Sequence, residues 1–244
     1  MSEAIIKIHE NSFELAAACA GELYSVIKTH TDNSKKINIA VSGGNTPKLL
    51  FDCIAEKFGN KINWDFVNLF WVDERCVAPD DIESNYGMTK KHLLDKIKIS
   101  PDNVHRIKGE DDPSSEAERY SKEIIKLVPA EKEFPRFDLI LLGIGPDGHT
   151  ASLFPDHIEP LNLDVVCKES VQPISGQKRI TLTETTINNS AMIYFLVSGS
   201  DKAKVVSQVL NRFPEAGGYP AFHINPTGGK VTWFLDKEAA SLLN

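Results

Sequence analysis

Cysteine is scarce in this chain of 244 residues, and long hydrophobic runs are lacking. The four cysteines are widely scattered and form no C-x-x-C pair, which argues against a disulfide framework and against the common structural zinc sites. No segment approaches the ~20 apolar residues of a membrane-spanning helix. The first residues contain no basic stretch followed by an apolar one, so no secretory signal is expected. These absences predict a cytoplasmic protein that does not enter the membrane.

Positive charge is also in short supply. Lysine and arginine number 27 against 34 aspartates and glutamates, which gives a formal net charge of -7. Nucleic acids bind basic surfaces, so no nucleic-acid partner is expected. An anionic small molecule remains compatible with this balance where a few cations converge. The apolar fraction of 41% supports a substantial core, and the length fits one domain over residues 1–244, as a monomer or a small homo-oligomer.

Apolar runs alternate with amphipathic segments along the chain. The runs predict strands, at residues 5–9, 37–41, 67–72, 138–142, 191–197 and 231–235. The amphipathic segments predict helices, at residues 12–29 with Ser12 as cap, 47–57, 85–94, 114–127 and 202–211, and a short one at the C-terminus. Residues 150–180 are expected to be irregular. The alternation predicts a Rossmann-like, doubly wound α/β fold, with a mostly parallel sheet and helices on both faces.

The strand at 138–142 ends in a turn of unusual composition, Gly143-Ile-Gly-Pro-Asp-Gly-His149. Ligands of open α/β sheets bind at the carboxyl ends of the strands, which is where this turn would lie. Asp147 and His149 are a candidate catalytic pair there. An imidazole titrates near neutrality, and a neighbouring carboxylate can fix its orientation, which suits general acid–base catalysis.

The same glycines match the dinucleotide-binding pattern G-x-G-x-x-G. A bound pyrophosphate needs a helix N-terminus, and Asp147 would place a negative charge beside that anion. Pro155 and Pro160 also leave little room for a long helix. We therefore expect an active-site turn here rather than a nucleotide site.

Two other chemistries are disfavoured by spacing. Asp147, His149, Asp156 and His157 carry zinc-binding side chains, but no two histidines are four residues apart, so no metal is expected. A serine hydrolase would need a nucleophile in G-x-S-x-G, and neither Ser42 nor Ser152 lies in that pattern.

A second glycine-rich segment, Val41-Ser-Gly-Gly-Asn-Thr-Pro47, connects a strand to a helix. Thr46 can serve as the N-cap, with Pro47 at the first helical position. The glycines allow the backbone to approach a ligand closely, and the helix N-terminus favours an anion. A tight, well-capped turn is the alternative. Beside the other polar segments, we favour phosphate binding.

Charged side chains also end the strand at 67–72. Asp73 and Arg75 are candidates for the site, since a guanidinium can pair with a phosphate or stabilise an oxyanion, whereas Glu74 is assigned a structural role. Two later cations, Arg179 and Lys202, lie near other element boundaries and could add positive charge. A solvated surface cluster is the alternative for each.

Three segments together resemble the 6-phosphogluconolactonase family: Ser42-Gly-Gly-Asn-Thr-Pro47, Asp73-Glu-Arg75 with Ser84-Asn85, and Gly143-Ile-Gly-Pro-Asp-Gly-His-Thr-Ala-Ser-Leu-Phe-Pro155. Weaker matches occur at residues 178–181, 199–203 and 233–236. The resemblance implies hydrolysis of 6-phospho-D-glucono-1,5-lactone to 6-phospho-D-gluconate in the oxidative pentose phosphate pathway. It also implies a Rossmann-like sheet and no metal or organic cofactor.

The related glucosamine-6-phosphate deaminase/isomerases share this fold and carry Asn-Glu-Pro after the Asp-Gly-His turn. Phe154 stands here in place of that glutamate, and an apolar ring cannot transfer protons. The substitution favours lactone hydrolysis over isomerisation. A non-catalytic sugar-phosphate sensor is the other alternative, and the retained Asp147–His149 pair argues against it.

The resemblance also implies roles for the candidate residues. His149 would take a proton from the attacking water, and Asp147 would orient its ring. Arg75 would bind either the oxyanion or the phosphate, while Asp73 would recognise a hydroxyl or hold Arg75. The 6-phosphate itself would be bound by Ser42, Gly43, Gly44, Thr46, Arg179 and Lys202.

Overall fold

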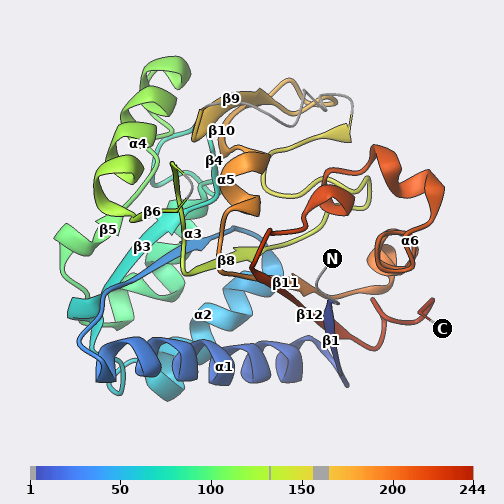
Figure 1. Cartoon of the computed structure of the whole chain (residues 1–244), viewed down its shortest axis with the longest axis horizontal. Helices are drawn as coiled ribbons and strands as arrows, with labels where there is room; N and C mark the ends of the chain where they lie inside the picture. The colour runs from blue at the N-terminus through green and yellow to red at the C-terminus, as the bar shows by residue number, and fades with distance from the viewer. Residues whose placement is uncertain (1–3, 132, 156–164, 244) are drawn as a thin grey trace.

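The computed structural model describes residues 4–131, 133–155 and 165–243 (Figure 1). Its centre is a seven-stranded sheet in which every pair of neighbours runs parallel. In spatial order the strands are β1 (Ile5–His9), β12 (Lys230–Asp236), β11 (Met192–Val197), β8 (Leu139–Leu142), β2 (Ile37–Val41), β3 (Val67–Trp71) and β5 (Val104–His105).

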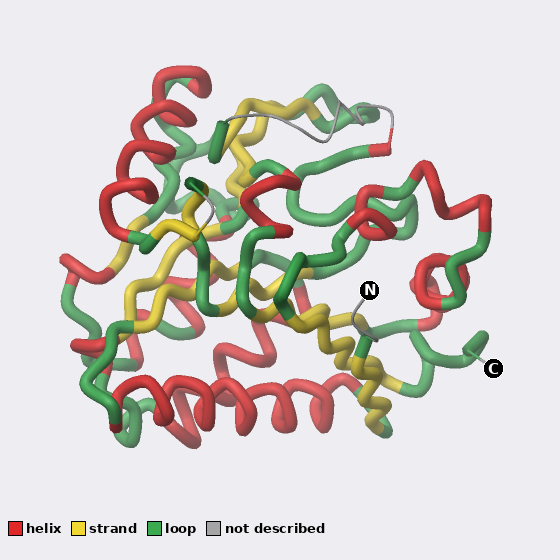
Figure 2. Tube along the Cα trace, in the orientation of Figure 1, coloured by secondary structure: helices red, strands yellow, loops and turns green. Residues whose placement is uncertain are grey.

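Helices cover both faces of this sheet. Figures 1 and 2 show α1 and α2 along one side and α4 and α5 on the other. The α-helices are α1 (Ser12–Asp32), α2 (Asn45–Phe58), α3 (Asn85–His92), α4 (Pro113–Leu127), α5 (Glu184–Asn188) and α6 (Ala203–Leu210). Short 3-10 helices occur at Trp64–Phe66, Leu94–Lys96, Pro101–Asn103, Ser200–Lys202, Pro214–Gly218 and Pro220–His223. The predicted doubly wound α/β fold is confirmed.

The central strands β2, β3 and β8 are buried along their whole length, because their apolar runs have a helical layer on each side. Asn38 and Asn68 interrupt these runs, and the Asn68 amide donates to Asn38 Oδ1 at 2.9 Å. The backbone N–H of Asn38 donates to Asp138 Oδ2 at 2.7 Å, just before β8 begins. The buried polar groups at this amino-terminal edge of the sheet are therefore paired.

The expectation that residues 150–180 are irregular is wrong in part. An antiparallel sheet contains β4 (Asp73–Arg75), β10 (Lys178–Leu182) and β9 (Cys167–Val171), in that order. Burial alternates along β9, because one face packs and the other meets solvent. Such a strand lacks the continuous apolar run that marked the central strands. A two-stranded sheet, β6 (Ala130–Glu131) with β7 (Phe134–Pro135), was also not predicted.

Several helix boundaries and caps differ from the predicted ones. Asn11, not Ser12, caps α1, and its side chain accepts from the backbone N–H groups of residues 13 and 14 at 3.0 Å. Gly44 precedes α2 with φ of 109°, so Thr46 already lies inside the helix and is not its cap. The end of the chain forms turns over residues 237–242 instead of the predicted helix. Ser84 caps α3, and its side chain accepts from the backbone N–H of residue 87.

The order of the strands fixes where a ligand can bind. From β2 the chain proceeds outward through β3 to β5, and then returns to β8 on the other side of β2. The connections that leave β2 and β8 therefore diverge, which opens a crevice at the carboxyl ends of these two strands. In the part of the chain that the structure describes, no helix is long and apolar enough to cross a membrane.

Candidate active site

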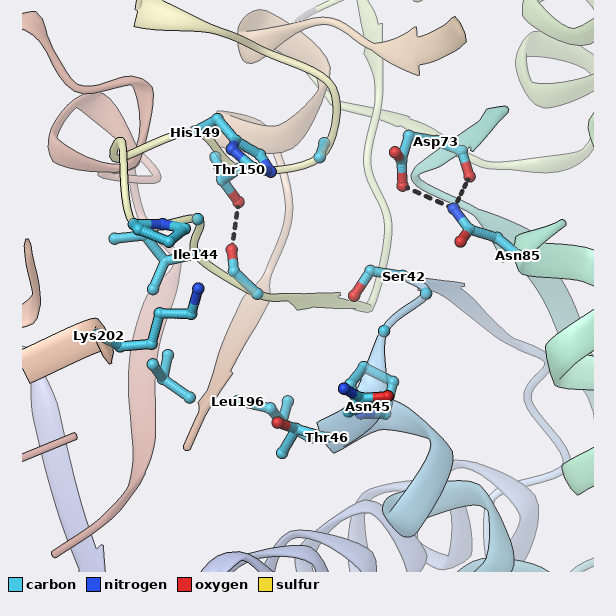
Figure 3. Close-up of a pocket in the computed structure, with 18 of the residues that line it drawn as sticks. Ser42, Asn45, Thr46, Asp73, Asn85, Ile144, His149, Thr150, Leu196 and Lys202 are labelled. Atoms are coloured by element: carbon cyan, nitrogen blue, oxygen red, sulfur yellow. Dashed lines mark hydrogen bonds between the residues drawn. The ribbon is translucent and has the colours of Figure 1, made fainter. Parts of the chain in front are cut away.

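A cavity of about 400 Å³ lies at this crevice (Figure 3). Its walls come from the connections after β2, β8 and β11 and from the paired strands β4 and β10. Nine of the ten predicted site residues line it: Ser42, Gly43, Gly44, Thr46, Asp73, Arg75, His149, Arg179 and Lys202. The tenth, Asp147, contacts His149 from outside the cavity lining. Candidates up to 160 residues apart in sequence thus meet at one place.

The turn after β8 holds the Asp147–His149 pair. His149 Nδ1 lies 2.6 Å from Asp147 Oδ1, and the His149 backbone N–H donates to the same oxygen at 3.2 Å. The turn is closed by a bond from Gly145 N to the His149 carbonyl at 2.8 Å. Because Asp147 engages Nδ1, Nε2 is the ring nitrogen left to exchange a proton with a ligand.

Close packing explains two glycines of this turn. A Cβ on Gly145 would lie 2.1 Å from His149 Nδ1, so a side chain there would displace the imidazole. Gly148 has φ of 84°, and a Cβ there would meet the Tyr219 ring at 2.3 Å. Residues 143–154 form turns and contain no helix. The helix N-terminus that a dinucleotide site requires does not follow the G-x-G-x-x-G pattern.

The connection from β2 to α2 forms the opposite wall. A Cβ on Gly43 would overlap the Asn85 side chain at 1.8 Å, so only glycine permits this approach. The Ser42 hydroxyl is buried without a hydrogen-bond partner among the described residues. The Thr46 hydroxyl is paired with that of Ser198 at 2.8 Å. The first turn of α2 carries no acidic side chain, so its N-terminal dipole favours an anion in the cavity.

Two guanidinium groups face the cavity side by side, because Arg75 on β4 is paired with Arg179 on β10. Arg75 donates to the Glu83 carbonyl, and Arg179 donates to Gln177 Oε1 at 2.9 Å. The buried Nε atoms of both arginines have no hydrogen-bond partner in the described part of the chain. Burial, and then the charge of Arg75, lower the pKa of Arg179. A bound anion would compensate for the lost hydration of the buried guanidinium and for the repulsion between the two positive charges. The arginine pair is therefore suited to bind an anion.

The two carboxylates of β4 have different surroundings. Asp73 Oδ2 accepts from the Ser152 hydroxyl at 2.7 Å and lies 3.9 Å from Arg179 Nη1, so this carboxylate supports the arginine of β10. Glu74 accepts from the backbone N–H groups of residues 75, 85 and 86 and from the Ser84 hydroxyl. Burial raises the pKa of Glu74, although these bonds oppose the shift. The structural role expected for Glu74 fits these contacts.

Lys202 ends the short 3-10 helix that follows β11, and its ammonium group pairs with Asp201 at 3.0 Å. Figure 3 shows its side chain extending into the pocket, with the His149 turn on one side and Thr46 on the other. A third cation therefore reaches the cavity.

Two polar residues around the cavity, Ser198 and Ser152, are not among the predicted site residues. Ser198 directly follows a buried strand, a position that could have marked it as a site residue. Ser152 is bonded to a residue 79 positions away and carries no local signal. Among the described residues no group of three or more histidines, cysteines or acidic side chains could hold a metal ion. Asp156 and His157, considered above as zinc ligands, lie outside the described residues.

Comparison with known proteins identifies the family. The model of the glucosamine-6-phosphate isomerases/6-phosphogluconolactonase family matches residues 10–233. The chain belongs to this family. Relatives of this family member include the 6-phosphogluconolactonase of Treponema pallidum, which is 42% identical over 197 residues, covering 81% of this chain and 82% of the relative. That of Haemophilus influenzae is 38% identical over 235 residues, covering 95% and 98%.

Solved structures agree with this assignment. The 6-phosphogluconolactonase of Trypanosoma brucei superposes on this family member with a TM-score of 0.89, at 29% identity over 99% of both chains. A monomeric glucosamine-6-phosphate deaminase reaches a TM-score of 0.79 at 22% identity over 98% of this chain and 99% of its own, which shows a shared fold only. The resemblance drawn from the sequence motifs is confirmed.

Proposed function

We propose that this protein is a 6-phosphogluconolactonase, which hydrolyses 6-phospho-D-glucono-1,5-lactone to 6-phospho-D-gluconate in the oxidative pentose phosphate pathway. The observation that carries the proposal is the 2.6 Å contact between His149 and Asp147 at a cavity into which three cations converge. The names of the relatives in Treponema pallidum and Haemophilus influenzae support the same substrate.

His149 acts as the general base. With its Nδ1–H donated to Asp147, the Nε2 lone pair takes a proton from water as the water oxygen attacks the C1 carbonyl. The carboxylate stabilises the imidazolium that forms, since the positive charge lies next to it. The imidazolium then returns its proton to the ring oxygen as the C1–O5 bond breaks. One water is consumed, and the products are a carboxylic acid at C1 and a hydroxyl at C5.

The phosphate is bound at the N-terminus of α2. Ser42, Gly43, Gly44 and Thr46 provide the cradle, and Arg179 and Lys202 provide charge. Arg75 serves either this phosphate or the C1 oxyanion, two roles that kinetics separate. If Arg75→Ala mainly raises KM, the arginine binds the phosphate; if it mainly lowers kcat, it stabilises the oxyanion.

Phe154 argues against deaminase chemistry. Its side chain is buried, and its ring centre lies 5.1 Å from that of His149. A phenyl ring at this position can neither accept nor donate a proton, which the glutamate of the deaminases is expected to do. The ring instead packs on one side of the imidazole.

We further propose that residues 1–244 fold as one domain and act in the cytoplasm, as a monomer or small homo-oligomer, without a nucleic-acid partner and without a metal or organic cofactor. The four cysteines are unpaired, as is usual for proteins of a reducing compartment. The net charge of -7 disfavours nucleic acid.

The test is a turnover assay on 6-phosphogluconolactone generated in place and scored against its spontaneous hydrolysis. His149→Ala is expected to lower kcat by about 10²–10⁴-fold, with the affinity for 6-phosphogluconate retained. His92→Ala is the matched control, because His92 also has an aspartate partner, Asp52 at 2.9 Å, but lies outside the cavity lining. Near-native turnover by His149→Ala would refute the base assignment.

The same assay separates the alternatives. Lys202→Ala and Arg179→Ala are expected to raise KM, and an unchanged KM in both would move the phosphate site elsewhere. If the wild-type protein binds 6-phosphogluconate and does not accelerate hydrolysis, it is a sugar-phosphate sensor.

A further inference from the structure

Asp236 is a buried carboxylate at the end of the weaker family match 233–236, and the proposed mechanism does not use it. It is the last residue of β12, is 5% exposed, and lies outside the cavity lining. Its two oxygens both accept from the backbone N–H of Gly199, at 3.1 Å each. Oδ1 also accepts from the Ala239 N–H at 2.8 Å. This carboxylate therefore links the end of β12 to two turns.

One of these turns, residues 198–202, carries groups that line the cavity. Strands β11 and β12 are parallel neighbours whose last pair is Val197 with Leu235, so Asp236 comes next to the start of the turn. Gly199 has φ of 98°, a left-handed conformation that favours glycine. Its carbonyl accepts from the Lys202 N–H at 3.1 Å, which closes the turn. The position of the lysine thus depends on a glycine whose N–H is held by Asp236.

The turn also reaches the phosphate cradle. Ser198, one residue before Gly199, pairs its hydroxyl with that of Thr46 in the first turn of α2. Asp236 therefore holds a segment with one contact to the cradle and one cation pointing into the cavity. A carboxylate suits this task, because it offers two acceptor oxygens, whereas an asparagine would turn an NH₂ group toward an N–H donor.

We propose that Asp236 is a positioning residue for substrate phosphate, which fixes the turn at residues 198–202 so that Lys202 faces the N-terminus of α2. The inference rests on the proposed role of Lys202 in binding the 6-phosphate. Asp236 does not touch the substrate, and it acts on affinity and not on the chemical step at His149.

The test is a double-mutant cycle on the full chain, with 6-phosphogluconate as the bound probe and lactone turnover as the second readout. Asp236→Asn is expected to raise Kd and KM about tenfold, the loss typical of one hydrogen bond to a charged group, and to leave kcat within about twofold. In the Lys202→Ala background the same substitution is expected to change Kd by less than about twofold, since the group being positioned is gone.

Two controls separate positioning from general damage. Asp138→Asn alters a carboxylate that also accepts a backbone N–H, at the opposite edge of the same sheet, and is expected to leave KM unchanged. Ser241→Ala removes a hydrogen bond within the C-terminal turn that Asp236 also holds, again with no change in KM.

Gly199→Ala perturbs the turn at residues 198–202 directly, through the positive φ of Gly199 and a Cβ 2.9 Å from Asp201 Oδ1. This variant should raise Kd as Asp236→Asn does.

The outcomes that overturn the inference are distinct. If Asp236→Asn raises Kd by the same factor in the wild-type and the Lys202→Ala backgrounds, Asp236 does not act through Lys202. If Gly199→Ala folds and leaves Kd unchanged, the geometry of the turn does not set affinity. If Lys202→Ala alone leaves Kd unchanged, the proposed phosphate role of Lys202 is wrong, and the inference falls with it.

Discussion

Gly145→Ala tests whether the geometry of the Asp147–His149 pair controls turnover. The added Cβ would lie 2.1 Å from His149 Nδ1 and 2.5 Å from Asp147 Oδ1. An ordinary contact begins near 3.4 Å, so the imidazole must retreat by about 1.3 Å. A displacement of ~1 Å at a reacting group can cost about 10²-fold in rate. We therefore expect kcat to fall by about two orders of magnitude.

The fold should tolerate this methyl group. Gly145 is not among the glycines with positive φ, so alanine fits its backbone conformation. The side chains of His149 and Asp147 are 31% and 48% exposed, which lets both move outward without unpacking the core. The affinity for 6-phosphogluconate should change little, because the phosphate cradle lies on the opposite wall.

The assay combines lactone turnover, 6-phosphogluconate binding and the thermal midpoint of unfolding. Gly218→Ala is the matched control, since a Cβ on Gly218 meets nothing within 4 Å and the residue directly precedes Tyr219, whose ring lies against Gly148 of the same turn. Native kcat in Gly145→Ala would show that the pair is not the catalytic base. A parallel loss of ligand binding would show that the phosphate site and the turn are not independent.

Two further predictions concern stability, measured by urea unfolding. Tyr120→Phe should cost about 1–3 kcal/mol, because the buried hydroxyl donates to the Trp71 carbonyl at 3.0 Å and accepts from its N–H at 2.8 Å, and both groups would lose their partner. Burial raises the pKa of Glu123, but bonds from His105 and Arg119 outweigh it and leave the pKa below its ordinary value of 4.5. The contribution of this carboxylate is therefore present above pH 4.5 and lost as the pH falls through the lower folded-state pKa, so Glu123→Gln should flatten the acid loss of stability. Lys122 also lowers the pKa of Glu118, but solvent screens this exposed pair, so Glu118→Gln should flatten the loss much less.

The parts of the site that could be predicted from sequence share a physical cause. Each central strand is an apolar run that stops abruptly, and polar residues just beyond it lie at the ligand-binding edge of the sheet. Asp73, His149 and the segment after Val41 were found in this way. Pro47 favours Thr46 as the cap, but Gly44, with its positive φ, is the cap, and the helix begins two residues earlier than predicted, at Asn45. Local sequence patterns therefore indicate whether a residue lies at the ligand-binding edge of the sheet. They do not indicate which hydrogen bond its side chain forms.

The parts that could not be predicted depend on contacts between distant segments. Ser152 supports Asp73 across 79 positions, and Asp236 holds the turn at Gly199 across 37. Neither partner has a local pattern that points to the other. The strand β9 could not be predicted because burial alternates along it, and β10 because only its last three residues, 180–182, are buried. The pairing that sets Arg179 beside Arg75 could therefore not be predicted either.

These distant contacts explain why the pocket can be organised before a ligand binds. The proposed base belongs to the turn after β8, the arginine pair to the small antiparallel sheet, and the proposed phosphate cradle to the start of α2. Short contacts join these units to one another and to the turn after β11: Ser152 to Asp73 at 2.7 Å, Thr46 to Ser198 at 2.8 Å, and the packing of Asn85 on Gly43. A lactone that enters such a site meets groups already fixed by the protein, so little binding energy is consumed in ordering them. Substitutions of Ser152, Ser198 or Asn85 should therefore lower kcat/KM without removing any group that the proposed mechanism places on the substrate.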